Sequence, residues 1–597
     1  MNFLEYYRNN LAYIRSLGAE FAAEFPKIAS RLELSAMECQ DPYVERLLEG
    51  TAFLAARVEE KLESGFPRLL ESVLSAVAPL ALYPVPSYTI LDLEPDFTDE
   101  RLKNGITIQP GDEFHCKLNN IQTPCRFSAM GSKKLYPLTL TEASYVTAGL
   151  EEYALPGKNI KSALALKLDY HGTVNPDMTG GDNDLSIFLN LTDGEASLLQ
   201  ELMLADLQGI YLKKEDKFIK APRDMCLSIP HFQEPHINSL KANTGLRKLQ
   251  HYLTYPALYK FISLSCSGEL FRSVKDGKIE IVFAFSRRES NFINALSRDN
   301  FKLWALPAVN LFRKTSGRSD FHGQFEQQVV PERTAPLDYE VFRIVSAKAF
   351  DDRNQEIVNY LPCYDPGCTP EDGVFIQHRR PRILNAQRTV RTSYPGSEVF
   401  ISFAGKKHGE KWENIRQFQA ETLCTNRDLP LLLRMSDPIQ SFSVSGIRKV
   451  SFLTPPGPPG NALCGQGNRE DWARIGYLAL NFSSLLWNDG NIPLEMLKEL
   501  IAAYSNRPEE ETVRLLDGMI SLHSAPKQFR FINRGSVFYE SGWHCEITFR
   551  EEAYAGFGVF TFGWVLKELL MSYTPLNSCM ELVMHTDKKR EVIVWKA

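Results

Sequence analysis

The cysteine and histidine residues of this 597-residue chain are the first candidates for a site of chemistry. Cys363 and Cys368 form the closest cysteine pair, with four residues between them. A zinc site would need a second pair of ligands, and the sequence supplies none at a suitable spacing. His231 and His236 stand beside prolines, which is typical of polar residues in a surface loop. These residues therefore predict no metal site.

Motifs for nucleotide binding and for hydrolysis are also lacking. The sequence contains no G-x-S-x-G elbow, no Walker loop, no H-E-x-x-H helix and no EF-hand loop. Gly556-Phe557-Gly558 begins like a dinucleotide-binding loop, but Gly563 follows two positions too late, so we predict an aromatic strand pair there. The basic run 378–382 predicts a solvated strand edge or a docking patch for an acidic partner. We therefore expect no enzyme, no metal and no cofactor.

Composition places the chain among ordinary globular proteins. Hydrophobic residues make up 44% and charged residues 23%, which excludes a largely disordered chain. The 67 basic and 73 acidic residues give a net charge of −6, which argues against a general nucleic-acid binder. Eleven scattered cysteines predict reduced thiols in the cytosol.

Targeting signals are not evident at the N-terminus. Glu5 and Arg8 interrupt any apolar stretch that a secretory signal would need. The longest apolar run, 73–83, is far shorter than the roughly 20 residues that span a bilayer. We expect a soluble, cytoplasmic protein without direct membrane insertion.

Helical periodicity dominates the first 80 residues. Apolar residues recur at three- and four-residue spacing from Phe3 to Phe25, and again from Val44 to Leu62 after the helix-start signal Asp41-Pro42. A third, shorter helix is predicted over 69–77. Such helices form either a self-contained bundle or a bundle with other chains, and their thin core favours other chains.

The remainder of the chain predicts a mixed α+β fold. Short runs rich in β-branched and aromatic residues predict strands at 88–93, 279–285, 340–345, 398–403, 543–549 and 592–595. Helices are predicted at 196–204, 493–504 and 508–518. We predict an N-terminal helical region 1–85, a β-rich domain 86–300 with a variable insert, and a mixed α/β domain 301–453. A Pro/Gly linker, 454–460, leads to a C-terminal α+β domain 461–597. This linker is a candidate hinge or strut.

Several blocks of sequence, in order along the chain, resemble one known family. They are Tyr6-Tyr7-Arg8-Asn9-Asn10-Leu11-Ala12-Tyr13-Ile14-Arg15, Gly18-Ala19-Glu20-Phe21-Ala22, Asp41-Pro42-Tyr43-Val44-Glu45-Arg46-Leu47-Leu48-Glu49, Cys125-Arg126-Phe127, Val309-Asn310-Leu311-Phe312, Cys424-Thr425-Asn426-Arg427-Asp428-Leu429-Pro430 and Gly556-Phe557-Gly558-Val559-Phe560. The chain resembles the TssF (VasA, ImpG) family, which are baseplate components of the bacterial type VI secretion system. The resemblance covers nearly the full length, is weak over 180–220, and lacks the C-terminal tail that is common in the family.

The resemblance implies a structural role. It implies that two copies join one TssG, that TssG carries TssK, and that wedges built in this way surround the VgrG hub as a platform for tube and sheath. The resemblance also implies TssE as a partner and docking of the baseplate at the inner-membrane complex. The alternatives are a ligand-binding, carbohydrate-like, multidomain β-rich protein without catalysis, and a secreted effector, against which the unpaired cysteines argue.

Two groups of residues are candidate partner contacts. On the N-terminal helices they are Tyr7, Leu11, Ile14, Leu48, Leu54 and Val58, which we expect to pack in an inter-subunit bundle. The second group is Asn426, Arg427 and Asp428. This group predicts either a turn in which Asn426 and Asp428 bond nearby backbone, or a contact loop toward TssG or the second copy.

Overall fold

A computed structural model describes most of the chain, in two compact units. The described residues are 3–29, 42–63, 66–118, 121–153, 155–156, 159–172, 184–214, 217–237, 244–265, 268–321, 326–364, 373–382, 391–405, 409, 412–462, 476, 492–505, 507–533, 536–574, 578–589 and 592–596. The first unit holds the N-terminal helices up to Val77, and the second begins at Ala78.

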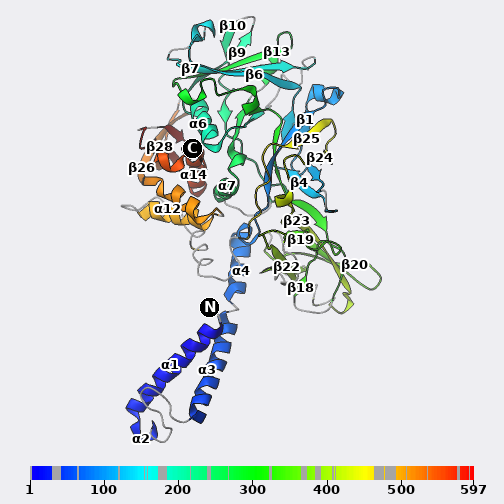
Figure 1. Cartoon of the computed structure of the whole chain (residues 1–597), viewed down its shortest axis with the longest axis vertical. Helices are drawn as coiled ribbons and strands as arrows, with labels where there is room; N and C mark the ends of the chain where they lie inside the picture. Colours follow the sequence, from blue (N-terminus) through cyan, green and yellow to red (C-terminus); the bar gives the residue numbers. More distant parts are fainter. Residues whose placement is uncertain are drawn as a thin grey trace. The chain divides into compact units, whose positions relative to one another are not determined.

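The N-terminal unit is helical, as its periodicity predicts. Its helices are α1 (Phe3–Glu24), α2 (Pro26–Ala29), α3 (Pro42–Glu63) and α4 (Phe66–Val77). Figure 1 shows α1 and α3 as a long pair with α2 at one end. Pro26 separates α1 from α2, because a proline within a helix removes a backbone donor and clashes with the preceding turn.

A closed β-barrel begins the second unit. Its strands follow the order β1 (Tyr88–Pro95), β15 (Ala305–Val309), β4 (Cys125–Ala129), β3 (Glu113–Cys116), β24 (Ile439–Ser441) and β25 (Ile447–Phe452). Leu91, Phe114 and Phe127 are fully buried in its core. The predicted ranges 86–300 and 301–453 both contribute strands to this barrel. A small sheet of β2 (Ile106–Ile108) and β5 (Lys133–Leu135) accompanies it.

Two antiparallel sheets and one helix share a second hydrophobic core. The five-stranded sheet has the order β10 (Lys217–Lys220), β9 (Leu207–Lys214), β13 (Lys278–Phe285), β7 (Ser162–Tyr170) and β6 (Leu138–Val146). The four-stranded sheet has the order β11 (Leu227–Ser228), β12 (Phe261–Leu264), β8 (Leu185–Leu189) and β14 (Phe301–Lys302). Helix α6 (Asp193–Leu204) shares their core and starts with a capping box between Thr192 and Glu195. The helices α7 (Thr244–Thr254) and α8 (Gly268–Arg272) complete this part.

An eight-stranded sheet forms a separate core. Along its main path the order is β16 (Phe312–Thr315), β23 (Gln417–Thr425), β19 (Glu340–Phe350), β20 (Glu356–Pro362), β21 (Val374–Pro381), β22 (Ser397–Ala404) and β18 (Gln327–Gln328), and β17 (Ser319–Asp320) pairs with β23. The basic run 378–382 lies on β21 and just beyond it. Arg379 donates to the carbonyls of Val341 and Phe342, and Arg382 pairs with Glu398. These two arginines therefore serve intramolecular contacts and not a docking patch.

A four-stranded sheet closes the chain. Its order is β26 (Met519–Asn533), β27 (Ser536–Phe549), β28 (Cys579–Thr586) and β29 (Ile593–Lys596), and β27 and β28 run parallel. The helices that pack with it are α12 (Ile492–Ala503), α13 (Glu509–Asp517) and α14 (Val559–Tyr573). Short 3-10 helices connect elements throughout: η1 (Pro79–Leu82), η2 (Glu100–Asn104), η3 (Leu150–Tyr153), η4 (Pro256–Tyr259), η5 (Ser290–Phe292), η6 (Arg298–Asn300), η7 (Trp412–Asn414), η8 (Leu429–Leu432) and η9 (Glu551–Tyr554).

The predicted strand pair at Gly556-Phe557-Gly558 is wrong. The segment leads into the helix α14, and Gly558 has a φ of 83° at the helix N-cap. A Cβ atom at Gly558 would lie 2.0 Å from Cβ of Ser197. The glycine is therefore required where α14 meets α6, and its role is close packing.

The Pro/Gly segment 454–460 is fastened to the barrel. The amide of Gly457 donates to the carbonyl of Tyr88 at 2.8 Å, and Val85 and Gly460 exchange two backbone hydrogen bonds. The Thr454 hydroxyl accepts from the amide of Ile90 at 3.0 Å. These contacts favour the strut over the hinge.

Candidate functional site

The α1–α3 pair is the first candidate interface. The Asn10 amide donates to the Glu59 carboxylate at 2.6 Å, and Arg15 forms an ion pair with Glu45. Asn10 contacts Glu59, and the later residue Arg15 contacts the earlier residue Glu45, so α1 and α3 run antiparallel. Ala56 on α3 is fully buried, and such a small side chain lets neighbouring helices approach closely.

A second apolar stripe on α3 faces solvent. It consists of Tyr43, Leu47, Leu54 and Val58, spaced by four, seven and four residues, which places them on one face of the helix. Leu54 is 65% exposed and Val58 is 59% exposed. Helix α1 adds exposed apolar side chains of its own: Tyr13, Leu17 and Phe21. Clustered exposure of this kind is typical of protein–protein contact sites.

The six predicted contact residues of these helices divide into two groups. Leu54 and Val58 lie on the exposed stripe of α3. The other four, Tyr7, Leu11, Ile14 and Leu48, are half-buried. Sequence periodicity marked both groups as apolar, but it does not distinguish a face that packs within the chain from one that faces solvent.

The turn Asn426-Arg427-Asp428 is the second candidate, and it lies inside the molecule. Asn426 and Asp428 are fully buried and Arg427 is 5% exposed. The carbonyl of Asn426 accepts from the amide of Leu429 at 3.0 Å, and Arg427 has a left-handed φ of 52°. The burial of all three side chains favours the turn over the contact loop.

Asn426 joins the end of β23 to the barrel. Its side-chain oxygen accepts from the Arg126 amide and from the Asn310 side chain, both at 2.9 Å. Its own amide donates to the Asn310 side-chain oxygen at 2.7 Å, and its side-chain nitrogen donates to the Pro124 carbonyl at 3.2 Å. The predicted partners were nearby backbone groups, and that detail is wrong because the partners lie more than 100 residues away.

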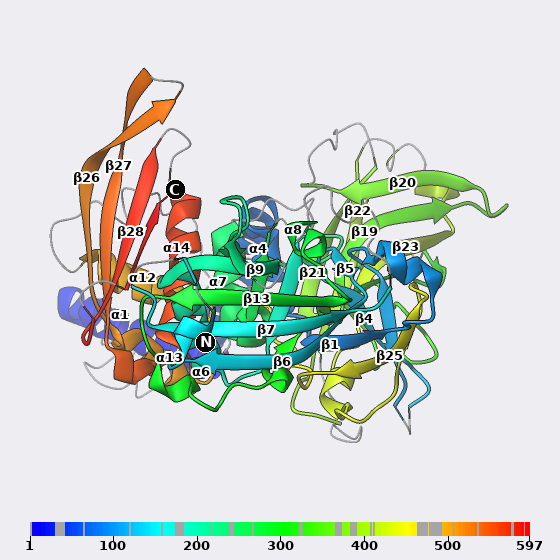
Figure 2. The same ribbon diagram turned by 90° about the horizontal axis from the view of Figure 1, so that it is seen from above.

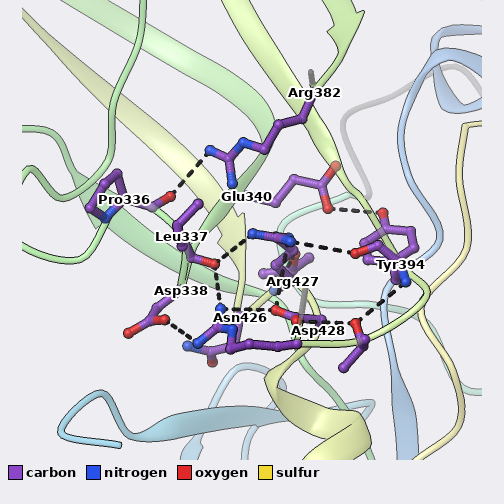
Figure 3. Close-up of polar contacts among 12 residues, drawn as sticks. Pro336, Leu337, Asp338, Glu340, Arg382, Tyr394, Asn426, Arg427 and Asp428 are labelled. Carbon is purple, nitrogen blue, oxygen red and sulfur yellow. Dashed lines mark hydrogen bonds and ion pairs between the residues drawn. The ribbon is translucent and has the colours of Figure 1, made fainter. Parts of the chain in front are cut away.

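Arg427 and Asp428 extend the same network to other loops (Figure 3). Arg427 donates to the Leu337 carbonyl at 3.0 Å, and Asp428 accepts from Arg391 and from Thr392, each at 3.1 Å. Burial lowers the pKa of Arg427, while the Asp428 carboxylate opposes that shift.

Tyr394 and Glu340 complete the set of buried polar groups around the turn. The Tyr394 hydroxyl donates to Glu340 at 2.9 Å, and burial raises the pKa of that hydroxyl well above 10.0. Arg126 lies on the barrel strand β4 and Glu340 on β19 of the eight-stranded sheet, so the network acts as a polar lock between the barrel and that sheet.

A third cluster of buried charges was missed in the sequence. Glu234, between the two loop histidines, accepts from the Tyr88 hydroxyl at 2.8 Å and contacts His251 at 2.7 Å, and it also pairs with Arg247. Burial alone would raise the pKa of Glu234, but Arg247 and His251 outweigh burial and hold it well below 4.5. The sequence does place Arg247 and His251 four residues apart, which puts both side chains on one face of a helix where they can share one acidic partner.

The two loop histidines differ from each other. His236 is exposed, as predicted for a surface loop, whereas His231 is half-buried and burial lowers its pKa to about 4. Within the described ranges, no three His, Cys, Asp or Glu side chains are grouped as metal ligands. Burial raises the pKa of Cys424 and of Cys545 to about 12, so neither thiol is a ready nucleophile. Cys368 lies outside the described residues.

No helix in the described part of the chain is both long and apolar enough to cross a lipid bilayer.

Comparison with known proteins shows the family. The model of the family "Type VI secretion system, TssF" matches residues 1–597. The chain belongs to the TssF family. A relative from Pseudomonas aeruginosa, the type VI secretion system component TssF1, is 29% identical over 615 residues, covering 100% of this chain and 98% of the relative.

Two solved structures share the fold of this TssF-family chain. A chain of the TssK-TssF-TssG baseplate subcomplex of a type VI secretion system matches with a TM-score of 0.69 and 20% identity, covering 93% of this chain and 98% of that one. A chain of the baseplate complex from the type VI secretion system matches with a TM-score of 0.53 and 18% identity, covering 100% and 98%. Both matches support the mixed α+β architecture.

Proposed function

We propose that this chain is a structural subunit of the type VI secretion baseplate wedge. Two copies would join one TssG, TssG would carry TssK, and the wedges would surround the VgrG hub, with TssE, as the platform for tube and sheath. The assembly would act on the cytoplasmic side and dock at the inner-membrane complex through its partners. The family membership and the likeness to chains of baseplate complexes support this role. No catalytic step is part of it.

The observation that carries the proposal is the solvent-facing stripe of α3. Leu47, Leu54 and Val58 expose apolar surface along one helix face, while Ala52 and Ala56 on the inner side are buried. A helix with apolar side chains on two opposite faces cannot bury both faces against a single neighbouring helix. Helices of TssG and of the second copy are the partners that would cover the stripe.

The predicted contact residues then take two roles. Leu54 and Val58 would contact the partner helices directly. Tyr7, Leu11, Ile14 and Leu48 are half-buried and would hold α1 and α3 in the geometry that presents the stripe.

The double variant Leu54→Asp/Val58→Asp tests this assignment. Full burial of each side chain contributes about 1.5–3 kcal/mol, and the variant also places two charges in the contact. We expect at least a tenfold loss of TssG in co-purification with the full chain. Thermal unfolding of the isolated chain should not change, because both residues are exposed.

Val513→Asp is the matched control, since Val513 is an exposed valine on a helix outside the pair. It should leave TssG co-purification at the wild-type level. Full recovery of TssG with the double variant would refute the helix interface.

A further inference from the structure

The β26–β27 hairpin continues past the sheet to which it belongs. β26 and β27 pair from Met519 opposite Phe549 out to Asn533 opposite Ser536. β28 pairs with β27 only from Gly542 onward. The two-stranded remainder, 528–533 and 536–541, is called the free arm below. At about 3.3 Å per residue, its six residues per strand reach about 20 Å, and Figure 2 shows β26 and β27 extending past the end of β28.

The base of the free arm is firmly held. Leu522 on β26 and Cys545 and Ile547 on β27 are buried in the sheet core. Gly542 stands where the third strand begins, and a Cβ atom there would lie 2.1 Å from the Cys579 carbonyl oxygen. This packing fixes the direction in which the free arm leaves the sheet.

Both faces of the free arm carry exposed aromatic side chains. Phe531 lies opposite Phe538 in the register, so these two emerge on one face. Arg530 lies opposite Tyr539, and this pair emerges on the other face. Phe538 is 53% exposed and Tyr539 is 66% exposed.

A free arm of this composition is poorly suited to water. An isolated two-stranded hairpin is marginally stable at best, and its outer edges present unpaired backbone groups. Apolar groups on both faces call for an occupant that encloses both faces of the free arm, which a flat surface does not do. A lipid phase would leave the backbone groups of the edges unsatisfied at a cost of several kcal/mol each, so the occupant is a protein.

The charge of the free arm indicates which side chains to expect on that partner protein. The segment 528–541 holds Arg530 and Arg534 against Glu540, or 2 − 1 = +1, in a chain whose net charge is −6, whereas Lys527 at its base pairs with Glu581 of the same chain. The exposed arginine beside an exposed tyrosine combines two residue types that dominate binding energy at interfaces. Carboxylates on the partner would complement this charge.

We propose that the free arm is a docking element whose exposed aromatic side chains insert into an apolar groove, rimmed by carboxylates, on a partner protein. This interface is additional to the one proposed for α1 and α3. It does not depend on that proposal, because it lies in the other compact unit of the chain.

Site-specific photocrosslinking in cells that assemble the full chain tests the proposal. p-Benzoylphenylalanine replaces Tyr539 in one strain and Ile219 in a control strain, since Ile219 is an exposed apolar residue on the edge strand β10. We expect at least five times more protein adduct from position 539. The crosslinked peptide, identified by mass spectrometry, should be apolar with Asp or Glu beside it.

Charge variants complete the experiment. Arg530→Glu, combined with the photocrosslinker at 539, should lower the adduct at least fivefold, and Arg530→Lys should retain it. Both variants should unfold at the wild-type temperature because residue 530 is exposed. Equal yields at 539 and 219, adducts to lipid or nucleic acid, a crosslinked peptide that lacks acidic residues, or an unchanged yield with Arg530→Glu would each overturn the proposal.

Discussion

Buried polar side chains fix how the sheets of this molecule meet. Apolar packing tolerates small rotations between two sheets, whereas a hydrogen bond weakens steeply when its angle changes. Asn426 satisfies groups on Arg126, Asn310 and Pro124 at once, and the position is fully buried. Removing it would leave several buried groups without partners, each of which costs about 1–3 kcal/mol.

Asn426→Ala should therefore destabilise the chain by about 2–4 kcal/mol. The measurement is the midpoint of urea unfolding followed by tryptophan fluorescence. Asn414→Ala, at an exposed position, is the control and should shift the midpoint little. Equal shifts for the two variants would show that the lock contributes nothing.

The buried Glu234 cluster predicts loss of stability in acid. The pKa of Glu234 in the fold lies well below its ordinary 4.5, so its contribution is complete above pH 4.5 and is lost as the pH falls through the folded pKa. Burial holds the pKa of His251 below 6.5 against the pull of Glu234, so protonating this histidine also favours unfolding, starting below pH 6.5. The unfolding midpoint should fall steadily from pH 7 to pH 4.

Glu234→Gln separates this cluster from general acid effects. It leaves Arg247 buried without its carboxylate, which should cost about 3–5 kcal/mol at pH 7, and it should remove part of the acid loss below pH 4.5. Glu100→Gln, at an exposed position, should keep both the wild-type midpoint and the wild-type pH profile. An unchanged profile in Glu234→Gln would contradict the assigned role.

At the residue scale, the sequence indicated the turn but not its partners. Asn426-Arg427-Asp428 has the composition of a turn, and the structure confirms one. Arg126 and Asn310 become neighbours of Asn426 only through the closure of the barrel, and no local pattern encodes that contact.

Secondary-structure elements follow local signals closely in this chain. The predicted helix 196–204 is observed as Asp193–Leu204, and the predicted strand 279–285 as Lys278–Phe285. Such elements are predictable because capping and periodicity act within a few residues. The error at Gly556-Phe557-Gly558 arose because its glycines serve a helix–helix contact that only the tertiary fold creates.

Gly245 offers a test of packing at this scale. A Cβ atom there would lie 2.7 Å from Cα of Leu569 on the neighbouring helix α14. Gly245→Ala should therefore force α7 and α14 apart and destabilise the chain by about 1–3 kcal/mol. Gly317→Ala is the control, since nothing lies within 4 Å of its Cβ position. A wild-type unfolding midpoint for Gly245→Ala would show that the helices can yield.

At the scale of the whole molecule, distant parts of the chain combine. β24 and β25, at 439–441 and 447–452, close a barrel that β1 opens at residue 88. The predicted domains 86–300 and 301–453 are consecutive ranges based on composition and linkers. Such signals cannot show that a late strand pairs with an early strand in the same sheet. The assembly role depended in turn on the family, because composition supports only a globular protein without a recognisable catalytic motif.

The mass of the complex with TssG would show whether this chain is a subunit of the baseplate wedge. The full chain would be co-expressed with TssG, and the purified complex measured by size-exclusion chromatography with light scattering. We predict a stable species that contains two copies of this 67.8 kDa chain per TssG. A monomer that does not retain TssG would contradict the assignment of this chain to the wedge.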